Sequence, residues 1–199
     1  MLIQTVEPVW GKNYKIGYVG FTHRTDELIE NGIAYFTRWN RLSDIKVSHC
    51  FIVAGPNSRI EATREGGVAH DDLYSLFDDP HTQVFFRKPA GYSVDIGERI
   101  YEEASEHNGE EYDLSLIAAH ALNGTFLGRF ISLDEHVCAL LNDPDEWVCS
   151  ELCAHSLDSL PEYHNRGILA MPDETIVPQE LFECPVIFEP WKTEELRRG

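Results

Sequence analysis

Two short segments, at residues 49 and 149, constrain the fold of this chain more than any other feature. His49 lies near the start of the apolar run Val47–Ala54, which is rich in β-branched and aromatic residues and is followed by Gly-Pro-Asn. This pattern predicts a buried strand that ends in a tight turn. Cys149 stands in a segment with helical spacing of apolar residues. The fold must therefore place an imidazole at the start of a strand and a thiol in the first turn of a helix.

The order of the predicted elements indicates an α+β fold. Further strands are predicted at residues 59–62, 66–70, 82–87 and 186–188. Helices are predicted at 26–39, from a Ser93 cap to 107, at 114–122, at 133–141 and from about 145 to 157, with a short turn starting at Pro178. Most strands precede most helices, which is typical of α+β rather than alternating α/β proteins. No internal repeat or low-complexity linker interrupts the sequence, so we expect a single domain over residues 1–199.

Charge and composition exclude several classes of partner. The chain has 16 basic and 34 acidic residues, a net charge of −18, which repels phosphate backbones and anionic lipids. We therefore expect no nucleic acid partner. No apolar run is long enough to span a membrane, so we expect no membrane insertion. The N-terminus shows no signal peptide and the five cysteines are an odd number, which favours free thiols and a cytoplasmic location.

Cys149 and His49 are a candidate nucleophile and base. A helix N-terminus and a nearby imidazole both stabilise a thiolate, which is the reactive form of cysteine. His49 adjoins a run of apolar residues, where an imidazole needs a hydrogen-bonding partner. Most of the other eight histidines lie in polar or turn-like segments and are expected to face solvent. On this hypothesis His49 takes the proton of Cys149 and later protonates the leaving group.

Glu61 is the candidate third member of the site. It lies between Ile60 and Ala62 on the strand expected to pair with the His49 strand. A carboxylate in such a position points either to solvent or to a specific partner. In the second case it can hold the distal nitrogen of the His49 ring, which is the orienting role in a catalytic triad.

Two less specific interpretations remain open at this point. Free cysteines are usually buried and inert, and we accept this interpretation for Cys50, Cys138, Cys153 and Cys184. A structural zinc site is the other alternative, because several side chains carry suitable ligand atoms: Cys149, Cys153, His155, His49 and Cys50. The chain has no second close pair of the usual kind, and Cys50 is expected to face away from His49 on the strand.

The motifs together resemble a known group of proteins. They are Ser48-His49-Cys50-Phe51-Ile52-Val53, Ile60-Glu61-Ala62, Gly67-Val68, Tyr112-Asp113 and Val148-Cys149-Ser150-Glu151-Leu152, followed by the Pro178-containing segment 175–181. In this order the chain resembles the circularly permuted branch of the papain-like NlpC-type superfamily, often called YiiX-like. The resemblance extends from about Gly17 to Val186. One segment departs from the family pattern, because Gly17-Tyr18-Val19-Gly20-Phe21 stands where the family usually has Gly-Asp-Ile.

The resemblance implies a permuted papain-like fold, in which the nucleophile helix packs on a small antiparallel sheet. It implies a Cys149–His49–Glu61 triad without a cofactor or metal, and a small peptide or acyl substrate. The reaction would be hydrolysis or acyl transfer at an amide, thioester or ester, with the backbone N–H of Cys149 as one oxyanion donor. The alternative functions are a catalytically silent ligand-binding module of the same fold and a structural zinc protein.

Overall fold

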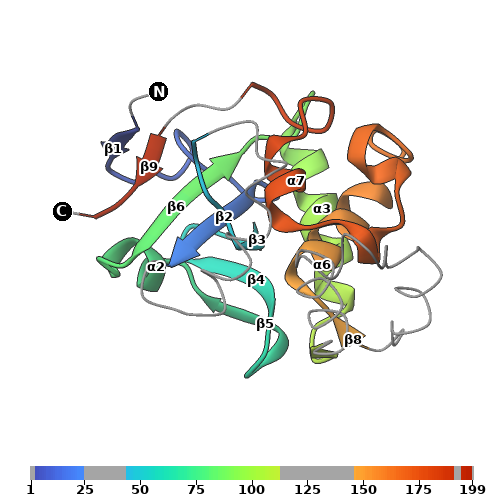
Figure 1. The fold of residues 1–199 in the computed structure, drawn as a ribbon, viewed down its shortest axis with the longest axis horizontal. Coiled ribbons are helices and arrows are strands. Elements are labelled where there is room, and N and C mark those ends of the chain that lie inside the picture. The colour runs from blue at the N-terminus through green and yellow to red at the C-terminus, as the bar shows by residue number, and fades with distance from the viewer. Residues whose placement is uncertain (1–2, 25–43, 113–145, 191–193, 199) are drawn as a thin grey trace, which may run out of the picture.

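The centre of the molecule is a five-stranded antiparallel sheet with the strand order β5-β4-β3-β2-β6 (Figure 1). The computed structural model describes residues 3–24, 44–112, 146–190 and 194–198. The strands are β2 (Val19–Arg24), β3 (His49–Val53), β4 (Ser58–Thr63), β5 (Gly67–Asp72) and β6 (Thr82–Arg87). Helices pack against this sheet, so the α+β class is confirmed.

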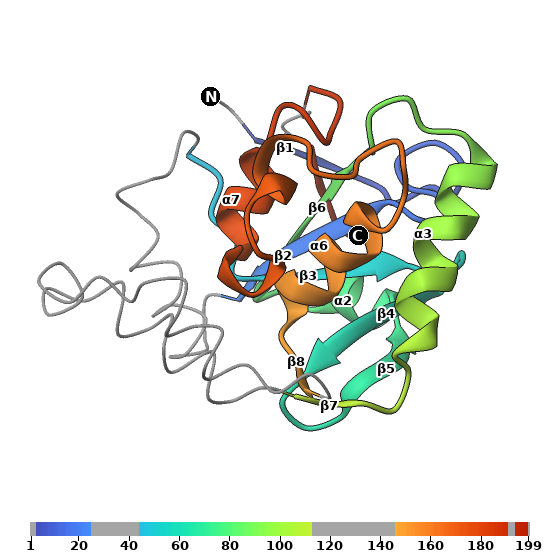
Figure 2. The same cartoon turned by 90° about the vertical axis from the view of Figure 1, so that its right-hand side faces the viewer.

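Helices cover one face of the sheet and smaller elements cover the other (Figures 1 and 2). The first face carries α3 (Val94–Glu106), α6 (Cys149–Asp158) and α7 (Pro178–Glu183). Against the second face lie α2 (Tyr74–Asp78) and the parallel pair of β1 (Gln4–Val6) and β9 (Glu194–Leu196). The remaining elements are β7 (Glu111–Tyr112), β8 (Glu146–Trp147) and the 3-10 turns η2 (Gly167–Ala170) and η3 (Asp173–Thr175). Within the described ranges, no helix has the length and apolar character needed to cross a membrane.

The alternation of side chains along β3 separates two hydrophobic cores. Cys50 and Ile52 point to the face that carries α3 and α6, where they join a cluster that includes Leu152 and Ile100. Phe51 and its neighbours on the same side of the strand join the cluster formed with α2. Because successive side chains of a strand point to opposite faces, a strand buried on both faces reads as a continuous apolar run. This is why residues 50–53 are apolar without a break.

Several predicted elements are confirmed. The predicted strand at 82–87 is β6, and the hairpin of residues 47–62 is β3 followed by β4. Ser93 caps α3 as expected, because its hydroxyl accepts the N–H of Ile96 at 3.2 Å. Pro178 occupies the first turn of α7. The helices predicted at 26–39, 114–122 and 133–141 lie outside the described residues.

Two predicted elements are wrong in their boundaries or type. The helix that carries Cys149 begins at Cys149 rather than near residue 145, because Glu146–Trp147 pairs with Glu111–Tyr112 as a strand and Val148 is extended. The strand predicted at 186–188 is replaced by turns and a single bridge between Pro89 and Phe188. Prolines at 185 and 190 flank this segment, and proline cannot donate a ladder hydrogen bond.

The contact of α3 with the chain before β2 generates a prediction about Gly97. A Cβ at this position would lie 2.3 Å from the carbonyl oxygen of Ile16, which is a backbone atom. Helix propensity alone favours Gly→Ala by about 1 kcal/mol, whereas overpacking costs about 1–3 kcal/mol. We expect Gly97→Ala to lower the free energy of unfolding in urea denaturation. Gly55→Ala, where a Cβ would have no neighbour within 4 Å, is the matched control. An unchanged or higher stability of Gly97→Ala would contradict this packing.

Candidate active site

The structure brings His49 and Glu61 into direct contact. His49 is the first residue of β3 and Glu61 lies on the neighbouring strand β4. The Nε2 atom of His49 is 2.7 Å from Oε2 of Glu61, and the Glu61 side chain is only 5% exposed. The register explains this contact, because β3 pairs with β4 through Ile52–Ile60. Continued along the strands, this register places Glu61 diagonally across from His49 on the same face of the sheet.

The strands β3 and β4 stop pairing before they reach His49. Among the described residues, their ladder consists of Ile52–Ile60 and Val53–Arg59. The alternation of the ladder directs the N–H of Cys50 toward β4. This N–H instead donates to the sulfur of Cys149, whose helix packs against the same end of β3. The open end of the ladder therefore receives the first turn of α6 and its thiol.

The side chains of Cys149 and His49 are in hydrogen-bond contact. Hydrogen bonding from the Cys50 side chain lowers the pKa of the Cys149 thiol, burial opposes this, and the charge and hydrogen bond of His49 lower the pKa further. The pKa of Cys149 ends well below its usual value. Burial would lower the pKa of the His49 ring, but the charge of Cys149 and hydrogen bonds to Cys149 and Glu61 raise it well above its usual value. The two pKa shifts have opposite signs, and both favour the charged forms, thiolate and imidazolium.

Glu61 remains ionised although it is buried. Burial would raise the pKa of its carboxyl, but the hydrogen bond and charge of His49 and the charge and hydrogen bond of Arg59 lower it to about 2. Arg59 reaches the other carboxylate oxygen, with Nε at 2.8 Å from Oε1. Each oxygen of Glu61 therefore has one basic partner.

The start of α6 is fixed by a cluster around Trp147. The indole ring lies 4.2 Å from the His107 ring and 5.2 Å from the His155 ring, measured between centroids. Its N–H donates to the carboxylate of Glu110, which also bonds to His107 at 3.0 Å. Because Trp147 is two residues before Cys149, these contacts hold the chain as it enters the helix.

A second contact holds the chain before β3. The side chain of Gln179 in α7 is buried, and its oxygen accepts the N–H of Val47 at 3.0 Å. Its amide nitrogen donates to the carbonyl of Ile45 at 3.1 Å and to Glu183 at 2.9 Å. The Pro178-containing segment noted in the sequence thus positions the residues that lead to His49.

The other cysteines and histidines lie as follows. Cys50, Cys153 and Cys184 are buried free thiols, as expected, and Cys138 lies outside the described residues. Cys50 nevertheless lies in the candidate site, because its side chain hydrogen-bonds with Cys149 and Cys153. His23 is an exception to the expectation that most other histidines face solvent, since it is buried and its Nδ1 is 3.3 Å from the Ser48 hydroxyl.

The zinc alternative finds no ligand set in the described part of the chain. No group of three or more His, Cys, Asp or Glu side chains there is arranged to hold a metal ion. His155, one of the proposed ligands, instead lies 3.5 Å from Asp173 and packs on Trp147.

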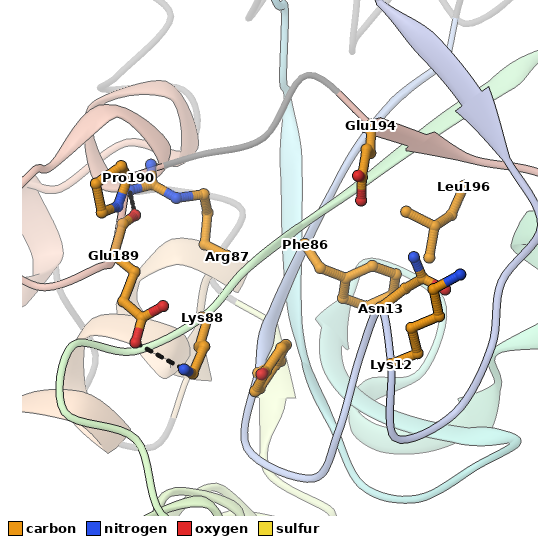
Figure 3. A pocket seen from close by; sticks show the side chains of 10 residues that line it. Lys12, Asn13, Phe86, Arg87, Lys88, Glu189, Pro190, Glu194 and Leu196 are labelled. Atoms are coloured by element: carbon orange, nitrogen blue, oxygen red, sulfur yellow. Dashed lines mark hydrogen bonds and ion pairs between the residues drawn. The ribbon is translucent and has the colours of Figure 1, made fainter.

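A hollow of about 240 Å³ lies away from these residues, at the far end of the sheet (Figure 3). Lys88 and Glu189 form an ion pair of 2.7 Å at its wall, and Arg87 also lines it. Arg87 pairs with Val19 on β2, three positions along that strand from Thr22, the partner of His49. This pocket is therefore separate from the Cys149 site.

Comparisons with known proteins give no independent assignment. No protein-family model matches the chain, and searches of curated proteins and of solved structures also return no match. The NlpC-type resemblance therefore stays a prediction that depends on the motifs and on the geometry of the site.

The contact between Cys50 and Cys149 generates a prediction about thiol reactivity. Cys50→Ala removes a hydrogen bond to the thiolate, so the pKa of Cys149 rises. We expect the pH midpoint of Cys149 alkylation by iodoacetamide to rise by about one unit, a tenfold change in thiolate below that pH. Cys50→Ser retains a hydrogen-bond donor, so we expect it to raise the pH midpoint of alkylation less than Cys50→Ala does. Cys184→Ala is the control for loss of a buried thiol, and a profile for Cys50→Ala that overlays the native one would refute the contact's role.

The pKa of Glu61 generates a prediction about stability at acid pH. The folded pKa of about 2 lies below the usual glutamate value of 4.5, so the stabilisation is complete above about pH 4.5 and is lost as pH falls toward 2. The difference corresponds to about 3 kcal/mol, at about 1.4 kcal/mol for each pKa unit. We expect the free energy of unfolding to fall more steeply over this range in the native chain than in Glu61→Gln. Urea titrations at each pH measure this, and parallel curves would exclude a buried, paired Glu61 carboxylate.

Proposed function

We propose that this chain is a thiol-dependent hydrolase or acyltransferase that acts on an amide or peptide, thioester or ester bond. Cys149 is the nucleophile, His49 the general base and acid, and Glu61 the orienting carboxylate. The observation that carries the proposal is the continuous contact from Cys149 through His49 to Glu61, in which the pKa of the thiol is lowered and that of the ring is raised. A thiolate placed beside an imidazolium at a helix start is the arrangement of an activated cysteine nucleophile.

The finer description of the fold belongs to the same proposal. A strand that opens with His49 precedes, by about half of the chain, a helix that opens with Cys149. This helix packs on an antiparallel sheet, between α3 and α7 (Figure 2), and eight of its ten residues are buried. Both features support a circularly permuted papain-like arrangement of the NlpC type.

The proposed reaction has two stages. The Cys149 thiolate attacks the carbonyl carbon, and the electrons of the C=O bond move to the oxygen, which the N–H of Cys149 at the helix start stabilises. The tetrahedral species collapses, expels the leaving group with a proton from His49, and leaves an acyl-thioester on the enzyme. His49 then removes a proton from water, for hydrolysis, or from an acceptor, for acyl transfer. Glu61 holds the ring during both proton transfers.

The test is a panel of chromogenic amide, ester and thioester acyl donors. We expect the native chain to release the chromophore from at least one donor class and Cys149→Ser to be slower by about 10³-fold or more, because the triad acts as a unit. The rate is expected to rise with pH through the lowered pKa of Cys149 and to fall above the raised pKa of His49. Cys184→Ser is the matched control for loss of another thiol. Equal turnover by Cys149→Ser and the native chain would refute the proposal.

A further inference from the structure

We propose that Arg59 is a fourth residue of this site, a positioning residue that acts through Glu61. The inference deepens the proposed function and rests on it, because it concerns how the carboxylate that orients His49 is itself held. Arg59 was not among the residues that the sequence pattern singled out. It becomes visible once the register of β4 and β5 is known.

The guanidinium of Arg59 holds one oxygen of Glu61 and leaves the other to His49. Nε of Arg59 is 2.8 Å and Nη2 is 2.7 Å from Oε1 of Glu61. Oε2 of the same carboxylate is 2.7 Å from Nε2 of His49. Arg59 and Glu61 are two residues apart on β4, so their side chains share one face of the sheet. A carboxylate held at Oε1 by the Nε–H hydrogen bond and by the ion pair with Nη2 cannot rotate without breaking these contacts, which fixes the direction of Oε2.

The guanidinium is in turn anchored from neighbouring elements. Nη2 lies 2.8 Å from Oδ2 of Asp71, which stands directly opposite Arg59 on β5. Nη1 donates to the carbonyl of Asp72. It also donates to the hydroxyl of Ser75 in α2, which is 3.3 Å away. The Arg59 residue is 5% exposed. The side chain is thus fixed on several sides, which a long flexible cation on the surface is not.

The charges around Arg59 show why its influence passes through Glu61. The titratable groups in contact with the guanidinium are Glu61 on β4 and Asp71 on β5, and Glu61 contacts His49 on β3. Asp71 is 58% exposed, so solvent screens it, whereas the Glu61 side chain is 5% exposed. Loss of Arg59 therefore leaves a buried carboxylate whose remaining partner is the ring that it must orient.

The experiment is a double-mutant cycle between Arg59→Met and Glu61→Gln, read as the pH midpoint of Cys149 alkylation by iodoacetamide. The Cys149 peptide is followed by mass spectrometry, so the other thiols do not contribute. We expect Arg59→Met to raise the midpoint by about one pH unit, a tenfold change. Glu61→Gln raises it at least as far, and the double variant matches Glu61→Gln. Arg59→Lys, which keeps the charge with a single point of contact, gives an intermediate midpoint and serves if Arg59→Met does not fold.

Arg87→Met is the matched control. Arg87 is also a buried arginine on the same sheet, but its guanidinium donates to the carbonyls of Phe182 and Glu189 at the far end. We expect this variant to lose stability without a change in the alkylation midpoint. An unchanged midpoint in Arg59→Met or Arg59→Lys, or full additivity with Glu61→Gln, overturns the role of Arg59 alone. A native Cys149 that reacts no faster than Cys184 near neutral pH overturns the proposed function as well.

Discussion

The site depends on one buried interaction, the hydrogen-bond contact between the sulfur of Cys149 and the ring of His49, in which the pKa shifts favour the charged forms. A single charge in such a place is very unfavourable, because protein interiors solvate ions poorly. The fold reduces the cost of burying this charge, because the β3–β4 ladder is open at one end and a helix begins there. The opening frees the Cys50 N–H for the sulfur, and the positive end of the helix dipole also favours negative charge at this point.

The other charges of the site extend this pair in an alternating series. From the buried sulfur outward, the pKa shifts favour a negative Cys149, a positive His49 and a negative Glu61. The ion pairs of Arg59 with Glu61 and Asp71 continue the series. The series runs across β3, β4 and β5 and ends at a carboxylate that is 58% exposed. His49, Glu61 and Arg59 thus each have an opposite charge on either side, and the outermost charge, that of Asp71, is exposed to water. This is how a sheet with two apolar faces accommodates several buried ions.

The sequence was sufficient for the parts that depend on local chemistry. The apolar run before Gly55-Pro56 predicted β3, and the Ser93 hydroxyl predicted the start of α3, because caps and turns act within a few residues. Arg59 and Cys50 were not identified, because their roles depend on strand register and on where α6 meets β3. The same limit affected residues 145–148, whose helix-start signals were overridden by pairing with the distant strand β7.

Strand alternation correctly predicts that Cys50 faces away from His49, but it does not predict which groups meet beyond the end of the strand. The two side chains do alternate, since Cys50 lies in the core on the α6 face and His49 shares a face with Glu61. Both nevertheless contact Cys149, because the sulfur lies at the end of the strand. Such a site needs only a strand end, a neighbouring strand and a helix start, each a few residues long. Short motifs can therefore resemble a family although no family model matches the chain.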